Sequence, residues 1–88
     1  MPEIVLTTVT VRVLLFASYA ELLGRDALEL QLESPATVGD AVQRLRSEPG
    51  GNRLPARLLC ALNLTQVGPG ARLATGDELA LLPPLAGG

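Results

Sequence analysis

Few residues of this chain have side chains that could take part in covalent chemistry. Its 88 residues include no histidine, one cysteine and seven basic residues, all of them arginine. Without histidine and with a single thiol, soft-metal sites and the usual pairs of nucleophile and base are almost excluded. Without lysine, the chain has no side-chain amine for Schiff-base chemistry or for receiving an isopeptide bond. The remaining candidates are the thiol of Cys60, the adjacent carboxylates of Asp77 and Glu78, and the carboxylate after Gly87 and Gly88.

The thiol and the adjacent carboxylates both favour a structural interpretation. Cys60 stands between Leu59 and Ala61 in an apolar run, where a free cysteine behaves as a small hydrophobic residue. We therefore predict a buried structural thiol rather than a redox-active or sulfur-donating one. Consecutive strand residues point to opposite faces, so Asp77 and Glu78 are predicted to be a turn residue followed by a solvated carboxylate, not an acid–base pair.

The end of the sequence, LLPPLAGG, is the third candidate. Glycine loses more conformational freedom on ordering than any other residue, so a chain end that simply frays would explain Gly87 and Gly88. The alternative is that the terminal carboxylate is the working group and passes through a channel too narrow for a Cβ atom. Two terminal glycines alone are a weak signal. A preceding strand, the stiff Pro83-Pro84 pair and the scarcity of other reactive groups strengthen the second interpretation.

Composition indicates a single domain and excludes several kinds of partner. Eighty-eight residues, 48% of them hydrophobic, can build one core. The aromatic residues are Phe16 and Tyr19 alone, so stacking platforms for bases are not expected. The net charge of −2 and the scattered arginines argue against a nucleic-acid partner. The lone cysteine suits a reducing cytosol and no apolar run is long enough to span a membrane, so we predict a cytoplasmic protein without a membrane partner.

The first part of the chain predicts two strands with a short helix between them. Val11–Ala17 is a β-branched and apolar run typical of a central strand. Ser18 and Glu21 have the spacing of a capping box, and Gly24 supplies a stop, so a short helix is expected there. Ala27–Glu33 alternates leucine with polar residues, which predicts a half-buried strand.

The rest of the chain predicts a longer helix and three strands. Thr37 is predicted to cap the helix, with Asp40 in its first turn and an apolar stripe after it. Leu58–Asn63 predicts a third strand, a very short strand follows, and Glu78–Leu82 predicts the last strand. This order favours an α+β fold with a helix across one face of a small mixed sheet. Residues 1–10 fit an extension of the first strand, a separate edge strand or a segment outside the fold, and these alternatives stay open.

Three segments resemble a known protein family. TGDELALLPPLAGG (Thr75–Gly88) resembles the end of the MoaD group in the MoaD/ThiS family of sulfur carriers, with its acidic turn, strand, Pro-Pro and Gly-Gly. VRVLLFASYAELLG (Val11–Gly24) is similar to that group's first strand and helix, and LLCALN (Leu58–Asn63) to the strand before its last hairpin. The likeness covers residues 11–88, and residues 1–10 have no counterpart in it.

The resemblance implies a ubiquitin-like β-grasp fold, a mixed sheet of about five strands with one main helix and a short helix packed on it. It divides the chain into an N-terminal extension of uncertain order (residues 1–10), the β-grasp domain (11–82) and a flexible sulfur-carrying tail (83–88). It also assigns Phe16 and Leu82 to the face that docks on partners. Leu82 stands where an aromatic residue is common in the family, so some docking area would be lost or met by a compensating partner.

The resemblance further implies a role for the tail, which consists of Pro83, Pro84, Leu85, Ala86, Gly87 and Gly88. An E1-like adenylating enzyme would use ATP to convert the Gly88 carboxylate into an acyl-adenylate, and a sulfur source would then leave a thiocarboxylate. The tail would insert into the large subunit of molybdopterin synthase, where its sulfur passes to a pyranopterin precursor of the molybdenum cofactor. This chain would be the non-catalytic small subunit that carries the reacting group, without a bound cofactor or metal of its own.

Three rival interpretations of the tail stay open. The first is a sulfur carrier of the same fold that serves thiamine synthesis or tRNA thiolation. The second is a ubiquitin-like protein modifier whose Gly88 ends in an amide bond to lysines of other proteins. The third is an interaction domain with an inert tail.

Overall fold

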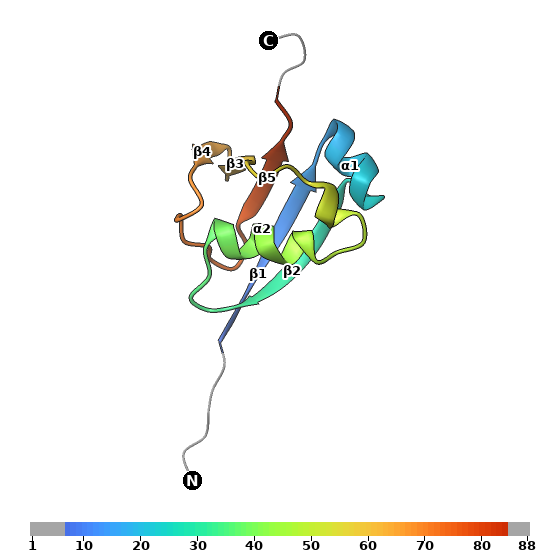
Figure 1. The fold of residues 1–88 in the computed structure, drawn as a ribbon. Coiled ribbons are helices and arrows are strands. Elements are labelled where there is room, and N and C mark those ends of the chain that lie inside the picture. The colour runs from blue at the N-terminus through green and yellow to red at the C-terminus, as the bar shows by residue number, and fades with distance from the viewer. Residues whose placement is uncertain (1–6, 85–88) are drawn as a thin grey trace.

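Two parallel strands from opposite ends of the chain form the centre of the sheet. In the computed structural model, which describes residues 7–84, β1 (Thr8–Leu15) lies beside β5 (Glu78–Leu82) (Figure 1). β2 (Ala27–Glu33) pairs antiparallel with β1, while β3 (Leu59–Leu62) pairs antiparallel with both β5 and β4 (Thr65–Val67). The strand order is β2-β1-β5-β3-β4. The mixed sheet predicted from the sequence is confirmed, including its very short strand.

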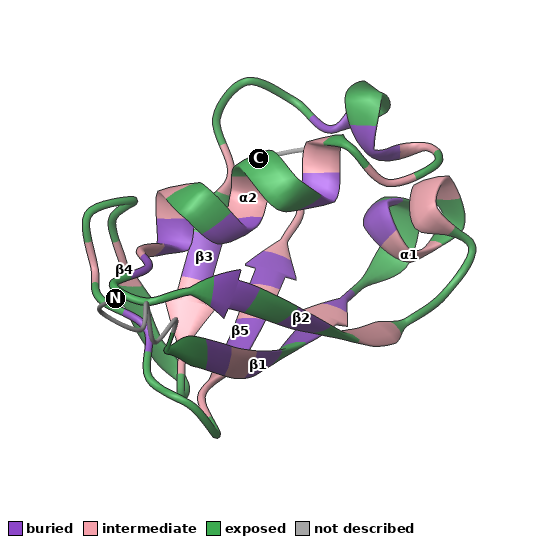
Figure 2. Ribbon diagram, turned by 90° about the horizontal axis from the view of Figure 1, so that it is seen from below, coloured by how far each residue is buried: buried purple, intermediate pink, exposed green. Residues whose placement is uncertain are grey.

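One face of the sheet is covered by a helix and the other face is open. α2 (Val38–Arg46) lies across the covered face and buries Val38, Ala41 and Leu45 against it (Figure 2). The strand residues buried beneath it alternate along β1 and β5: Val9, Val11, Val13, Leu15, Leu79 and Leu81. Among residues 7–84 no polar or charged side chain is buried, so burial of apolar surface holds the two layers together.

The start of α2 is confirmed in detail. The Thr37 hydroxyl accepts a hydrogen bond from the Asp40 N–H (3.2 Å), and the Asp40 carboxylate accepts one from the Thr37 N–H (2.9 Å). This capping box satisfies backbone donors that have no partner within the helix. At the other end, the Arg46 guanidinium donates to the carbonyl oxygen of Leu54 (2.9 Å), just after the short 3-10 helix η1 (Gly51–Arg53). The irregular segment that follows α2 is thereby tied to it.

The predicted start of the first helix is wrong. α1 (Ala17–Leu23) has Phe16 as its N-cap and no side-chain cap, so Ser18 lies inside the helix and forms no capping box. The reason is that β1 stays paired with β5 as far as Leu15, which leaves one extended residue before the helix begins. The predicted stop at Gly24 is confirmed. Its φ of 72° lies in the left-handed region, which glycine adopts without Cβ strain.

Both ends of β1 also differ from the prediction. The strand was expected over residues 11–17, but it begins at Thr8 and ends at Leu15. Thr8, Val9 and Thr10 pair with the last three residues of β2, so this part of the predicted N-terminal extension belongs to the sheet. Of the alternatives for residues 1–10, extension of the first strand holds for residues 8–10, and residues 1–6 lie outside the described residues.

Asp77 is confirmed as a turn residue. Its carboxylate accepts hydrogen bonds from the Asn63 side-chain amide (2.9 Å) and from the Ala74 N–H (2.7 Å). The Asn63 side-chain oxygen in turn accepts from the N–H of Glu78 (2.9 Å), whose side chain is half-buried rather than fully solvated. These bonds join the β3–β4 turn to the turn before β5. The carboxylate of Asp77 therefore sets the position at which β5 starts.

Candidate functional site

β5 carries the chain to the end of the sheet at which the predicted tail begins. Because β1 and β5 are parallel, both finish at this end (Figure 1). Leu82, paired with Leu59, is the last residue of β5, and Pro83 has no N–H with which to continue the ladder. Pro83 is half-buried and Pro84 is exposed. The other predicted tail residues, Leu85, Ala86, Gly87 and Gly88, lie outside the described residues.

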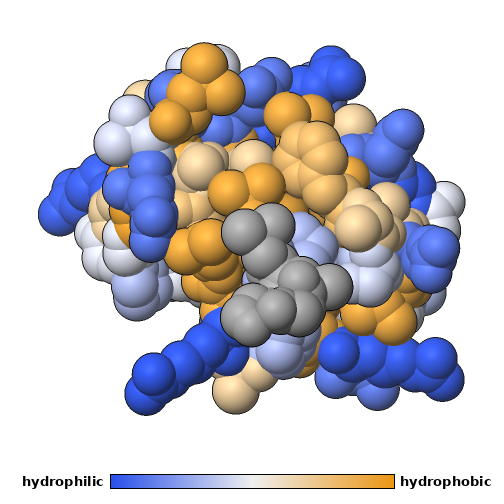
Figure 3. Space-filling view, turned by 90° about the horizontal axis from the view of Figure 1, so that it is seen from above, coloured by the Kyte–Doolittle hydropathy of each residue, from blue (hydrophilic) through white to orange (hydrophobic). Residues whose placement is uncertain are grey.

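Apolar side chains gather on the open face of the sheet beside this point. We call this surface the exit patch, and it consists of Leu14, Phe16, Leu59, Ala61, Ala80 and Leu82. The register places the five strand residues on one face, because Ala80 is paired with both Leu14 and Ala61 while Leu59 is paired with Leu82. Phe16 follows two residues after Leu14 in an extended conformation, which continues the alternation. Viewed from the end at which β5 finishes, the molecule shows apolar surface near its centre and charged residues at its edge (Figure 3). Contiguous exposed apolar surface is uncommon on proteins that act alone, so the exit patch is a candidate docking surface.

The two residues predicted to dock on partners come together at this end of the sheet. Phe16 follows Leu15, which is paired with Leu81, and Leu82 follows Leu81, so each stands one residue beyond that pair. Phe16 is 44% exposed and Leu82 is half-buried. Their assignment to a partner interface stays a prediction, since no partner chain is present.

The sequence reasoning missed Leu59, which is 43% exposed on the β3 side of the exit patch. A usable signal was present. Cys60 was predicted to point into the core, and strand alternation then requires its neighbour Leu59 to point to the open face. The alternation says which face Leu59 is on, but only the pairing with Leu82 shows that it lies beside the end of β5.

The far half of the open face is polar. There Arg12 is paired with Glu29 on β2 and with Glu78 on β5, so opposite charges lie side by side across three strands. Near the exit patch the charged residue is Arg57, which lines a shallow hollow of about 280 Å³ together with Pro84. The other residues of this hollow are Tyr19, Leu58, Leu59 and Leu82. The open face is therefore apolar where the tail leaves and charged where β5 begins.

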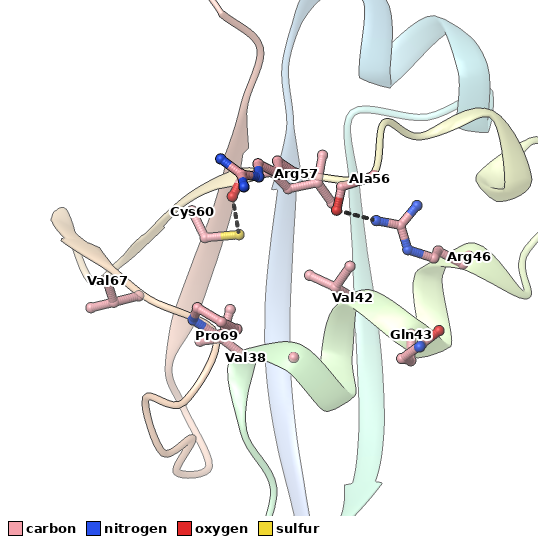
Figure 4. A pocket seen from close by; sticks show the side chains of 11 residues that line it. Val38, Val42, Gln43, Arg46, Ala56, Arg57, Cys60, Val67 and Pro69 are labelled. Atoms are coloured by element: carbon pink, nitrogen blue, oxygen red, sulfur yellow. Dashed lines mark hydrogen bonds between the residues drawn. The ribbon is translucent and has the colours of Figure 1, made fainter.

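Cys60 is confirmed as a buried structural thiol. It is 4% exposed and lies on the covered side of the sheet, facing away from the exit patch. Its Sγ borders a cavity of about 530 Å³ between α2 and the β3–β4 hairpin, opposite Val38 and Val42 (Figure 4). The thiol makes a weak hydrogen bond to the carbonyl oxygen of Leu58 (3.9 Å). Burial raises the pKa of the Cys60 thiol above its ordinary value of 9.0, so it is a poor nucleophile at neutral pH.

Ionisation of Cys60 is expected to destabilise the fold at alkaline pH. A thiol with a raised pKa in the folded state holds its proton more tightly there than in the unfolded chain. The free energy of unfolding should stay constant up to about pH 9 and fall as the pH rises further. Burial, and then the charge of Cys60, also raise the pKa of Tyr19, which adds to the fall.

Urea denaturation at a series of pH values measures this effect. The Cys60→Ala variant, although less stable throughout, should show a shallower fall above pH 9 than the wild type, since Tyr19 alone then contributes. A wild-type stability that rises above pH 9, or an equal slope in both proteins, would contradict the prediction.

The described residues supply no evident metal site or membrane span. Within residues 7–84, no group of three or more His, Cys, Asp or Glu side chains is arranged to hold a metal ion. No helix in that part of the chain is long and apolar enough to cross a membrane.

The chain is similar to known sequences along most of its length. The ThiS family model matches residues 13–88. The molybdopterin synthase sulfur carrier subunit of Escherichia coli (strain K12) is 37% identical over 81 residues, covering 89% of this chain and 99% of that protein. Small archaeal modifier protein 1 of Haloferax volcanii is 36% identical over 85 residues, covering 84% of this chain and 95% of that protein.

Solved structures share the fold. The crystal structure of small archaeal modifier protein 1 from Haloferax volcanii matches with a TM-score of 0.77 at 31% identity, covering 90% of this chain and 99% of that one. A chain in the complex of subunits 1 and 2 of the molybdopterin-converting factor from Helicobacter pylori matches with a TM-score of 0.68 at 21% identity, covering 90% of this chain and 99% of that one. The predicted ubiquitin-like β-grasp fold is confirmed.

Proposed function

The chain belongs to the ThiS family and is a MoaD-like, ubiquitin-like sulfur carrier, and we propose that it serves as the small subunit of molybdopterin synthase. The observation that carries this proposal is the exit patch, an open apolar surface directly beside the point where β5 ends in Pro83 and Pro84. The identity to the Escherichia coli sulfur carrier subunit over nearly the full length of both chains supports it.

The proposed reaction begins at the carboxylate of Gly88. An E1-like adenylating enzyme uses ATP to convert this carboxylate into an acyl-adenylate, because a free carboxylate is a poor electrophile. A sulfur source then displaces AMP and leaves a thiocarboxylate. In the large subunit of molybdopterin synthase this sulfur passes to the pyranopterin precursor. ATP belongs to the activating enzyme, and the carrier itself needs no bound cofactor.

The exit patch and the two prolines would contribute to partner binding in different ways. The patch supplies apolar area that a partner covers, while Pro83 and Pro84 restrict φ where the chain leaves the sheet. Because the backbone is already restricted at these two prolines, the chain loses less conformational entropy when the residues after them enter a partner. Gly87 and Gly88 have no Cβ, so they suit a narrow channel and leave the terminal carbonyl open to attack. The catalytic groups then come from the partners, which is consistent with the few reactive side chains of this chain.

Intact-mass spectrometry tests the proposal directly. The purified chain is incubated with a MoaD-type E1-like enzyme, ATP and sulfide, and its mass should increase by the difference between one sulfur and one oxygen atom. The loaded chain, mixed with a large subunit of molybdopterin synthase and the pyranopterin precursor, should lose that increase.

Two outcomes would count against the proposal, and they differ in meaning. No mass gain, with the same enzyme active on its own carrier, would contradict the sulfur-carrier chemistry. If the chain gains sulfur but does not lose it to the large subunit, it is still a sulfur carrier. Its pathway would then be thiamine synthesis or tRNA thiolation in place of molybdopterin synthesis.

Replacing Phe16 by alanine is expected to weaken binding to the large subunit roughly tenfold or more without unfolding the protein. The side chain is 44% exposed, so its loss removes contact area from the exit patch and leaves little cavity in the core. Titration calorimetry measures the affinity, and far-ultraviolet circular dichroism measures the fold.

Leu64→Ala is the matched control for this variant. Leu64 is 94% exposed in the turn between β3 and β4, which lies toward the start of β5 and away from the exit patch. Its replacement should leave affinity unchanged. Loss of the circular dichroism signal in Phe16→Ala would assign Phe16 to the core, and equal losses of affinity in both variants would remove the exit patch as the docking surface.

A protein-modifying role is a second candidate, favoured by the 36% identity to small archaeal modifier protein 1 of Haloferax volcanii. In that case the activated Gly88 would form an amide bond with lysines of other proteins. Tryptic peptides carrying a Gly88-linked remnant, isolated from cells that express a tagged chain, would support this role. If no such peptides are found under conditions in which the chain is loaded with sulfur, the modifier role is wrong and only the carrier role remains.

A further inference from the structure

β2 forms one edge of the sheet, and β4 forms the other (Figure 1). β4 has three residues whereas β2 has seven, so β2 is the edge with room for a further strand. An edge strand carries a row of backbone N–H and C=O groups without partners in the sheet, and such a row can pair with a strand of another chain. Whether β2 can pair in this way depends on which of its groups point outward and on what covers them.

The register with β1 identifies the outward groups of β2. Just after β2, the Ser34 N–H donates to the carbonyl oxygen of Thr7 (2.8 Å). Just before it, the carbonyl oxygen of Asp26 accepts a hydrogen bond from the Leu15 N–H (2.9 Å). Because hydrogen-bonded pairs alternate along an antiparallel ladder, the even-numbered residues of β2 direct their backbone groups toward β1. The residues that direct N–H and C=O groups away from β1 are Ala27, Glu29, Gln31 and Glu33.

The outward row of β2 is complementary to a second copy of itself. In an antiparallel pairing about a twofold axis at Leu30, Glu29 lies opposite Gln31 of the second copy, and the other glutamate of β2 lies opposite its alanine. No carboxylate then lies directly opposite another, so this register avoids like-charge repulsion between facing residues. On the covered face Leu28, which is half-buried in the single chain, would lie opposite Leu32 of the second copy and lose exposed apolar surface.

Arg44 of α2 covers the middle of this edge. Its guanidinium donates to the carbonyl oxygen of Gln31 (3.2 Å), which is one of the outward groups. In the pairing about Leu30, the same oxygen would instead accept a hydrogen bond from the Glu29 N–H of the second copy. Arg44 and Gln31 also line an open groove of about 700 Å³ between α2 and the end of β2. Strand addition therefore requires that one guanidinium be displaced from each of the two chains.

We propose that Arg44 keeps the β2 edge closed to a second copy of this chain, and that without Arg44 two copies join edge to edge in one continuous sheet. The contact is made by backbone groups of β2 and by the leucines of its covered face. Because each copy contributes its β2 edge, the assembly is complete at two copies. The inference does not depend on the proposed sulfur chemistry.

Sedimentation velocity over a concentration series tests the proposal on the full chain. Arg44→Ala should dimerise with a dissociation constant at least tenfold lower than that of the wild type. Arg44→Met, which keeps an unbranched aliphatic side chain but no donor, should do the same. The matched control is Arg53→Ala, which makes the same change in charge. Arg53 is exposed in η1 and donates no side-chain hydrogen bond within residues 7–84, so this variant should associate no more than the wild type.

Amide hydrogen exchange locates the contact. In the Arg44 variants the N–H groups of Glu29 and Gln31 should exchange at least tenfold more slowly at concentrations that give dimer than in dilute protein. Circular dichroism checks that each variant is folded.

Three results would overturn the proposal. The first is that both Arg44 variants are folded and no more dimeric than the wild type. The second is dimerisation without slower exchange at Glu29 and Gln31, or to the same extent in Arg53→Ala, because the contact would then not be the edge that Arg44 covers. The third is assembly without limit beyond two copies, or loss of the fold in both Arg44 variants, which would show that Arg44 serves the stability of the single chain.

Discussion

Replacing Gly50 by alanine is expected to lower the free energy of unfolding by about 3–5 kcal/mol. Two effects combine at this position. Gly50 has a φ of 84°, in the left-handed region that a residue with a Cβ adopts at a cost. A Cβ added there would also overlap the carbonyl oxygen of Leu22 in α1. Because that oxygen belongs to the backbone of a helix, the overlap cannot be relieved by a side-chain rotation.

Two further alanine variants separate these effects. Gly76 has a φ of 94°, but a Cβ added there would meet no atom within 4 Å, so Gly76→Ala should cost only the backbone strain, about 1–2 kcal/mol. Gly70 has open space and no positive φ, and Gly70→Ala should change stability by less than about 0.5 kcal/mol. Urea denaturation followed by circular dichroism measures all three. If Gly50→Ala and Gly76→Ala lower the free energy of unfolding by the same amount, the close packing of residue 50 against α1 adds nothing to the cost of the backbone strain.

Removal of Gly88 is expected to reduce sulfur loading by about 100-fold or more while the fold stays intact. The deletion withdraws the terminal carboxylate by one residue, roughly 3.5 Å, from the place where the adenylating enzyme must activate it. Even a displacement of about 1 Å can cost a factor of 100 in rate when reacting groups are held in register. Gly88→Ala keeps the length but adds a Cβ beside the reacting carbonyl, and it should also load poorly.

The control for these tail variants is Gly70→Ala, the same exchange in a loop with open space. Its loading should match the wild type. Intact-mass spectrometry after incubation with enzyme, ATP and sulfide gives the loaded fraction, and circular dichroism confirms that each variant is folded. Normal loading of the Gly88 deletion would contradict a role for this residue as the acyl carrier.

The predictions from sequence that hold are those whose cause is local. Thr37 caps α2 with Asp40 in its first turn, as predicted, and the reciprocal bonds of the capping box connect residues only three positions apart. Gly24 ends α1 because its own φ is left-handed, and Pro83 ends β5 because it has no N–H. The alternation in Ala27–Glu33 needs no partner to be visible, and β2 has these bounds. The family resemblance likewise came from contiguous motifs.

The predictions that fail depend on pairing between distant residues. Ser18 has the correct spacing for a cap, yet pairing of β1 with β5 through Leu15 places the start of α1 at Ala17. The start of β1 at Thr8 follows from the length of β2, which continues to Glu33 and offers a partner for each residue. A local pattern cannot contain this information, because the partner strand lies elsewhere in the chain.

By itself, therefore, the sequence determined the order of the helices and strands, that Cys60 is structural, and that few side chains other than the terminus could react. The tertiary structure decided where these parts meet. It placed Phe16, Leu59 and Leu82 on one open face beside the end of β5, and it brought Arg57 to the same hollow as Pro84. The physical reason is that strand register and sheet order join residues far apart in the chain, whereas capping, alternation and backbone stops act within a few residues.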